Sequence, residues 1–147
     1  MLLLLFLLFL YFIFVNKEGF KNNNVLEICS TYPMTGYARD GYCKLIGGDK
    51  GTHTVCAKVT QRFLEFSRDK GNNLIDKKGD FPGLEHGDNW CLCALRWKEA
   101  YKCAEDPTCS DLNPGDVPKI YIDGTHKKTL DFIEDLYDPE IMERYSL

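Results

Sequence analysis

The chain has 147 residues, with 18 Lys and Arg against 22 Asp and Glu and a formal net charge of −4. A nucleic-acid groove needs clustered Lys and Arg, and no part of the sequence is a basic run, so we expect no nucleic-acid partner. About 125 residues follow the apolar start, which is the size of one domain with a core that does not need disulfides.

Residues 1–15, MLLLLFLLFLYFIFV, are apolar throughout. As a helix, this run spans roughly 21 Å, less than a hydrocarbon core of about 30 Å unless the helix extends and a lysine reaches the interface. It lacks the basic start and the small-x-small cleavage site of a signal peptide. We therefore expect residues 1–20 to form an apolar helix that anchors the protein in a membrane as a single-pass segment, followed by a linker at 21–24. Secretion after signal cleavage is the alternative.

The charges and cysteines after this segment suggest a compartment. Lys17 and Lys21 follow the apolar run and no Lys or Arg precedes it, so the positive-inside rule places the following domain in the cytoplasm. Secreted disulfide scaffolds more often have an even cysteine count in a shorter chain. We therefore expect reduced thiols. The seven cysteines are Cys29, Cys43, Cys56, Cys91, Cys93, Cys103 and Cys109.

The first half of the domain begins without regular structure. Residues 25–52 contain repeated turn signals, at Tyr32-Pro33, Thr35-Gly36, Asp40-Gly41 and Gly47-Gly48-Asp49, and predict irregular structure. Residues 54–59 predict a strand. Thr60 is a plausible N-cap for a helix whose apolar residues share one face and which ends near Gly71.

A second strand and helix are expected after a loop at 72–89. Residues 90–94 are apolar on both faces, which is typical of a short central strand. From Ala94 the apolar residues recur at helical spacing, and Asp106-Pro107 ends that helix.

The last third of the chain predicts one more strand and two helices. Residues 103–116 form a polar loop and 117–123 a strand. Thr125 is expected to cap a helix, and Asp138 followed by Pro139 begins a last short helix. The predicted fold class is α+β: one small domain over residues 25–147 with about three short strands, each followed by a helix, in addition to the N-terminal apolar helix.

Cys91 and Cys93 raise the question of a metal or thiol site. On a strand, residues two apart point to the same face, so both thiols would meet one metal or one partner. Zinc needs about four ligands, and Cys56, His53 and His126 are the candidates to complete the set. Paired C-x-x-C motifs are absent, and free cysteine packs as a small apolar side chain. We therefore favour a buried face over a metal site.

The sequence GTH occurs twice, ending at His53 and His126. A positive charge in the first turn of a helix opposes the macrodipole, so His126 should be neutral or face an anion. With Lys127 and Lys128 beside it, this turn offers N–H groups and cations to a carboxylate or phosphate, or is only a solvated turn. Arg39 either presents its guanidinium from a loop to an anionic ligand or pairs locally in a turn.

Three long runs and the start of the domain carry a family resemblance. The runs are DGYCKLIGGDKGTHTVCAKVTQRFLEFSRDKGNNL, FPGLEHGDNWCLCALRWKEAY and DGTHKKTLDFI, and the start is NVLEICSTYPMTGYARDG. In order and spacing, these residues closely resemble the bacterial family called domain of unknown function 2237, over roughly residues 24–145.

The resemblance implies small soluble proteins and no established activity, so it assigns no catalytic residue. This chain departs from the family pattern in its N-terminal apolar segment. It also has Tyr42 where many relatives have a second cysteine beside Cys43, and a longer loop at 103–116. The longer loop implies that Cys103 and Cys109 are local additions.

Two hypotheses of function remain. The first is a small-ligand-binding or interaction domain, for which a small anion is a suitable ligand. Its candidate binding residues are Arg39, His53, Trp90, Trp97 and His126. The alternative is a cysteine/histidine enzyme or metal site. Its catalytic candidates are Cys56, Cys93, His53 and His126, and its metal candidates are Cys91 and Cys93. The sequence predicts no particular cofactor, and the common hydrolase, zincin and nucleotide motifs are absent.

Overall fold

The computed structural model describes residues 25–147. The apolar helix expected within residues 1–20 and the linker at 21–24 lie outside the described residues. No helix within residues 25–147 is long and apolar enough to cross a membrane.

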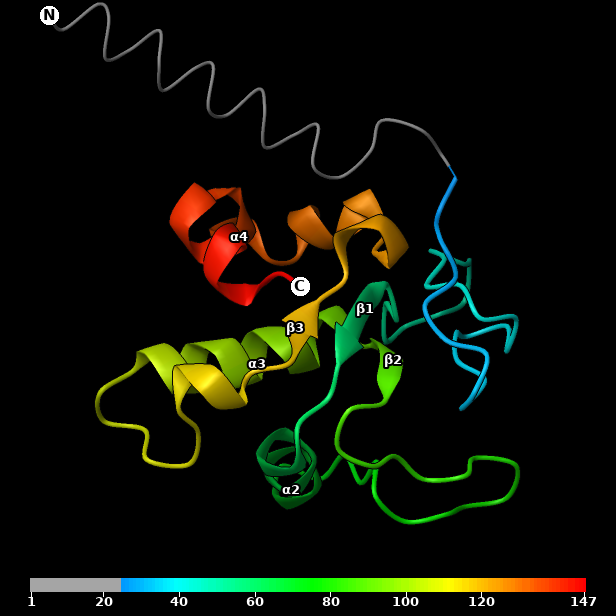
Figure 1. Ribbon diagram of the computed structural model, residues 1–147, viewed down its shortest axis with the longest axis horizontal. Coiled ribbons are helices and arrows are strands. Elements are labelled where there is room, and N and C mark those ends of the chain that lie inside the picture. The colour runs from blue at the N-terminus through cyan, green and yellow to red at the C-terminus, as the bar shows by residue number, and fades with distance from the viewer. Residues whose placement is uncertain (1–24) are drawn as a thin grey trace, which may run out of the picture.

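Three short strands form one antiparallel sheet in the order β2-β1-β3 (Figure 1). The strands are β1 (Val55–Lys58), β2 (Asn89–Leu92) and β3 (Lys119–Ile120). The central strand β1 pairs along its length with β2 and at two positions with β3. The predicted α+β class is confirmed as a small single domain with mixed helix and a three-stranded antiparallel sheet.

Two α-helices follow the first two strands, as the sequence predicts. Helix α2 (Gln61–Asp69) begins at Thr60, whose hydroxyl accepts a hydrogen bond from the Phe63 N–H at 3.1 Å. Helix α3 (Ala94–Glu105) continues directly from β2 and contacts α2. The helix therefore starts at Ala94, the residue from which the apolar residues recur at helical spacing.

An aromatic cluster of Trp97, Tyr101 and Tyr145 forms the centre of the core. The Trp97 ring stacks on Tyr101 with centroids 5.5 Å apart, and Tyr145 meets both rings edge-on. Trp97 is fully buried, and its indole N–H donates to the Pro118 carbonyl at 2.8 Å. This donation satisfies the polar group that the ring brings into the core.

The prediction of a helix capped by Thr125 is wrong. The segment forms three short 3₁₀ helices, η2 (Ile122–Gly124), η3 (Lys127–Asp131) and η4 (Glu134–Tyr137). The Thr125 hydroxyl instead accepts the Cys56 N–H at 3.0 Å, so it fastens this segment to β1 and is not free to cap. The apolar residues Leu130, Ile133 and Leu136 of this segment are nevertheless buried.

The last helix is confirmed. Helix α4 (Pro139–Tyr145) has Asp138 as its N-cap, and the Asp138 carboxylate accepts the Glu140 N–H at 2.9 Å. A further 3₁₀ turn, η1 (Pro114–Asp116), lies in the polar loop before β3. Figure 1 shows α4 together with η2 to η4 at one end of the molecule and α2 at the other, whereas η1 lies against α2 and α3.

The expectation of reduced cysteines is wrong, because six of the seven are paired. The disulfides are Cys29–Cys56, Cys43–Cys91 and Cys103–Cys109, and Cys93 is the free cysteine. Cys56 and Cys91 are direct partners across β1 and β2, yet each is bonded to the irregular segment before β1. The odd count correctly indicated one unpaired thiol.

Candidate functional site

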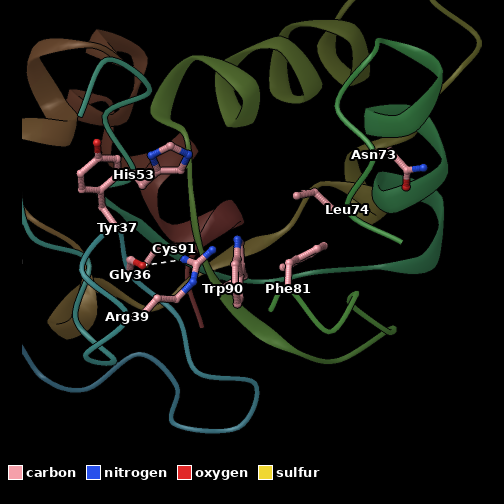
Figure 2. A pocket seen from close by; sticks show the side chains of 9 residues that line it. All are labelled: Gly36, Tyr37, Arg39, His53, Asn73, Leu74, Phe81, Trp90 and Cys91. Carbon is pink, nitrogen blue, oxygen red and sulfur yellow. Dashed lines mark hydrogen bonds between the residues drawn. The ribbon is translucent and has the colours of Figure 1, made fainter. Parts of the chain in front are cut away.

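A pocket of about 380 Å³ lies where the segment before β1 meets β2 and the loop after α2 (Figure 2). Its lining side chains come from three stretches that are far apart in the sequence. The lining residues are Gly36, Tyr37, Arg39, His53, Asn73, Leu74, Phe81, Trp90 and Cys91. Figure 2 shows Arg39 beside Trp90 and His53 beside Tyr37, with Asn73 and Leu74 across the pocket.

Trp90 is a buried aromatic side chain in the lining of this pocket. Phe81 meets its ring edge-on with centroids 5.4 Å apart, and the Arg39 guanidinium carbon lies 5.1 Å from the Trp90 ring centroid. A guanidinium at this distance from an indole is attracted by the negative face of the ring. The cation of Arg39 therefore lies over the indole ring of Trp90.

The backbone holds Arg39 in an unusual conformation. Its φ is 54°, in the left-handed region that L-residues other than Gly rarely adopt. The Arg39 Nη1 donates to the Gly36 carbonyl at 2.7 Å, which fixes the guanidinium. Gly36 has φ +91°, and a Cβ there would lie 2.5 Å from the Tyr42 carbonyl oxygen, so this turn requires glycine.

A hydrogen bond and a disulfide attach the turn to the sheet. The buried Thr35 hydroxyl accepts the Cys91 N–H at 2.8 Å, and Cys91 is also bonded to Cys43. Both links end at the same residue of β2, next to Trp90. The Arg39 turn is therefore held against the sheet at the floor of the pocket.

His53 is oriented by a buried carboxylate. Its Nδ1 lies 2.7 Å from the Asp49 Oδ1, and its backbone N–H donates to the Asp49 Oδ2 at 2.8 Å. Burial alone would raise the Asp49 pKa, but the hydrogen bonds from His53 and from the Gly51 N–H outweigh it and lower that pKa below its ordinary value. Asp49 is therefore an anion that orients the imidazole through Nδ1. Nε2 is the ring nitrogen that does not contact Asp49.

The imidazole of His53 rests on Gly51. A Cβ at Gly51 would lie 2.4 Å from the His53 Cε1, so no side chain fits there without moving the ring. The Tyr37 ring stacks on the His53 ring, with centroids 6.2 Å apart and an angle of 24° between the planes. Thr52, between Gly51 and His53, has φ 47°. Within residues 25–147, Arg39 and Thr52 are the non-glycine residues with positive φ, and both lie at this site.

A second pocket, of about 220 Å³, adjoins the first and shares His53 and Trp90 with it. It adds the free thiol of Cys93, which is partly exposed and is the N-cap residue of α3. It also adds Arg96, whose Nη1 donates to Glu99 at 2.9 Å and to the Lys70 carbonyl at 3.2 Å. The lining of the smaller pocket therefore includes the oriented imidazole of His53, the ring of Trp90 and a free thiol.

Comparison with known families identifies the chain. A family described as "Uncharacterized protein conserved in bacteria (DUF2237)" matches residues 21–138. The chain belongs to this family. The resemblance stated from the sequence is thereby confirmed. No curated protein matches the chain. Membership of DUF2237 assigns no reaction to the chain.

Three of the five residues predicted to bind a ligand come together in this DUF2237 protein. Arg39, His53 and Trp90 line the larger pocket. Trp97 lies in the aromatic core instead, because its ring is fully buried and its N–H is satisfied there. His126 lines neither pocket. It is the N-cap of η3, and its Nδ1 accepts the Lys128 N–H at 3.1 Å.

Burial chiefly lowers the pKa of His126, and the positive charges of Lys127 and Lys128 lower it further. The expected preference for the neutral form is therefore supported. Lys128 pairs with Asp131 at 2.8 Å, which directs one of the neighbouring cations away from the turn. These contacts favour a structural role for His126.

The catalytic and metal candidates separate in the structure. Cys56 is bonded to Cys29, so it is not a thiol, whereas Cys93 and His53 share the smaller pocket. Cys91 and Cys93 do not form one buried sulfur face, which corrects the sequence interpretation. Strand β2 ends at Leu92, Cys91 turns to its disulfide, and Cys93 begins a helix.

One further group of sulfur atoms has the proximity that a metal site needs. The Sγ atoms of Cys29, Cys43 and Cys56 lie within 4.8 Å of one another. All three belong to disulfides, and a metal binds the thiolate form of cysteine. In the oxidised state, these atoms are therefore structural links.

Sequence reasoning missed Asp49, Tyr37 and Phe81. Asp49 lies four residues before His53 in a glycine-rich turn, a position from which its carboxylate can accept nearby N–H groups, and this signal was available. Asp88, just before β2, accepts the Glu85 N–H at 2.8 Å and caps a turn. Tyr37 and Phe81 reach the pocket only through the tertiary fold.

Proposed function

We propose that this DUF2237 domain binds a small, flat molecule with a carboxylate or similar anionic group in the pocket above Trp90. The observation that carries the proposal is the placement of Arg39. Its guanidinium is held by a left-handed backbone over the ring of Trp90. Strained backbone conformations concentrate at ligand sites, where the surrounding structure maintains them.

The chemistry of the lining supports this class of ligand. Within residues 25–147, the guanidinium of Arg39 donates one hydrogen bond, to the Gly36 carbonyl, and pairs with no carboxylate. Its remaining N–H groups form the planar fork that matches a carboxylate. Trp90, Phe81 and Leu74 supply apolar area for the flat part of the ligand. A volume of about 380 Å³ is within the range of small-molecule pockets.

A fluorescence titration of the full chain in mild detergent tests the proposal. The Trp97→Phe variant leaves Trp90 as the one tryptophan. We expect benzoate and nicotinate to change its fluorescence saturably, and benzamide, which has the same shape without the charge, to bind at least about tenfold more weakly because it lacks the charge-assisted hydrogen bonds.

Arg39→Gln in the same background should abolish the preference for carboxylates. Arg62→Gln is the matched control, because Arg62 is an exposed arginine on α2 that pairs with Glu65. Equal binding of benzoate and benzamide, or an unchanged preference in Arg39→Gln, would refute the proposal.

We also propose that residues 1–20 hold the domain at a membrane and that the domain faces an oxidising compartment. The apolar run supports the first part. The second part replaces the cytoplasmic orientation expected from Lys17 and Lys21. It rests on three disulfides within the described residues, since such bonds persist in oxidising environments.

Alkaline carbonate extraction of membranes, combined with a membrane-impermeant thiol reagent on intact cells, tests this placement. We expect the chain to stay with the membrane pellet and the free thiol of Cys93 to be labelled before lysis. A chain released by carbonate, or labelled only after lysis, would contradict it.

A further inference from the structure

The free thiol of Cys93 lies where a nucleophile would be useful. Cys93 is the free cysteine among residues 25–147, and it is partly exposed in the pocket of about 220 Å³. It precedes the first turn of the 12-residue helix α3, and its side chain makes no capping hydrogen bond. First-turn N–H groups have no acceptor within the helix, and they favour negative charge on a bound group.

His53 reaches the same pocket from the neighbouring segment. The Ala94 N–H donates to the Thr52 carbonyl at 3.1 Å, so the chain around His53 runs directly beside the start of α3. His53 and Cys93 both line the smaller pocket. No hydrogen bond joins Cys93 Sγ to His53 within the described part of the chain. Catalytic hydrogen bonds are often formed only when a substrate is bound.

Asp49 determines which nitrogen of His53 is basic. With Nδ1 2.7 Å from the buried, anionic Asp49, the neutral imidazole is stabilised in the tautomer that donates from Nδ1 to this carboxylate. Nε2 of the neutral ring is then a proton acceptor. This is the orienting relation that a carboxylate supplies to a catalytic histidine.

We propose that Cys93 is a nucleophile, that His53 is its general base, and that Asp49 is a positioning residue, together acting on esters or thioesters. His53 Nε2 takes the thiol proton as Sγ attacks the acyl carbon. The bond from that carbon to the leaving oxygen or sulfur breaks, and the leaving group takes the proton. Water then cleaves the Cys93 thioester, which releases the acid and restores the thiol.

This inference places the reaction in the smaller pocket and does not depend on what Arg39 binds. An acetate ester carries no anionic group, so acylation of Cys93 in the unaltered protein tests this inference alone. Saturable binding of benzoate by the unaltered protein tests the carboxylate proposal alone. Each therefore fails on its own measurement.

The test is acylation of the full chain by p-nitrophenyl acetate, with the modified residue located by mass spectrometry. We expect a burst of nitrophenol that matches one acetyl group on Cys93 and is absent in Cys93→Ser. His53→Gln and Asp49→Asn should each slow the burst by at least about tenfold, the lower range for general-base catalysis. Because Asp49 acts through His53, Asp49→Asn should also change the pH profile of the burst, which a purely structural role would not do.

His86→Gln is the matched control, because His86 is an exposed histidine near the start of α2 and outside both pockets. It should acylate normally. An equal burst in His53→Gln, or no acetyl group on Cys93 of the unaltered protein while lysines are acetylated, would overturn the inference. The second outcome needs no variant, so it decides the matter even where a variant does not fold.

Discussion

The guanidinium of Arg39 lies 5.1 Å from the ring centroid of Trp90, although the two residues are about fifty positions apart in the chain. Arg39 adopts φ 54° to reach this place. The pairing joins the strained turn of the irregular segment to the edge of β2, and it gives the pocket both its cation and its flat surface.

The Arg39→Gly variant separates the effect of the backbone conformation on stability from the effect of the side chain on binding. Glycine accepts positive φ freely, whereas other L-residues lose roughly 1–2 kcal/mol there. We expect the free energy of unfolding in urea to stay unchanged or rise by about 1 kcal/mol, while the preference for benzoate over benzamide is lost.

Thr52→Gly is the control for Arg39→Gly, since Thr52 also has positive φ but does not line the larger pocket. It should keep the carboxylate preference. Retained preference in Arg39→Gly would show that the guanidinium plays no part in binding.

Gly51→Ala should displace His53 without straining the backbone at position 51. The new Cβ would lie 2.4 Å from the His53 Cε1, so the ring must leave its contact with Asp49. We expect Cys93 acetylation to slow by about tenfold or more, as for loss of the base. Gly47→Ala is the control, because a Cβ at Gly47 meets nothing within 4 Å. Equal rates in the two variants would argue against the role of His53.

The free energy of unfolding should decrease as the pH is lowered through the titration of His126. Burial and then the neighbouring lysines lower its pKa in the folded protein, so the unfolded chain takes up the proton first. The stabilising effect of the neutral form is complete above the unfolded value of about 6.5 and declines as the pH falls below it toward the folded pKa. Urea unfolding between about pH 7.5 and about pH 5.5 measures this.

Lys127→Ala should weaken the pH dependence assigned to His126, because it removes a positive charge that lowers the histidine pKa. His126→Gln should remove the dependence from this window. An unfolding free energy that falls equally in His126→Gln would assign the effect to another group.

The disulfides should differ in their contribution to stability. Cys43 and Cys91 are 48 positions apart, whereas Cys103 and Cys109 are 6 apart. Loop-closure entropy then predicts losses of about 4 and about 2 kcal/mol when each pair is replaced by serine. Chemical denaturation measures both losses. Replacement of Cys43 and Cys91 should also abolish benzoate binding, whereas replacement of Cys103 and Cys109 should leave it intact.

Several elements could be predicted from local sequence. Thr60 and Asp138 are N-caps as expected, because a capping side chain needs only its own first turn. The change from strand to helix at Ala94 follows from the change in apolar period. Thr125 misled the prediction because its hydroxyl is used by β1, 69 positions away.

The site was only partly predictable for the same reason. Arg39, His53 and Trp90 were selected for their chemistry, and the fold brings them together. Trp97 was selected by type alone, and only the tertiary structure shows that it is core. The cysteines were assigned to the wrong redox state because sequence spacing does not reveal that Cys29 and Cys43 pack over the β1–β2 pair.

Cys56 and Cys91 face each other across the sheet but are bonded outward to a segment that has almost no regular structure of its own. Within that segment, sulfur replaces the strand pairing that would otherwise hold the Arg39 turn in place. Formation of these two links from thiols consumes an oxidant. Protein prepared in a strong reductant would keep its helices and lose its binding site, so every assay of ligand or ester should begin with oxidised material.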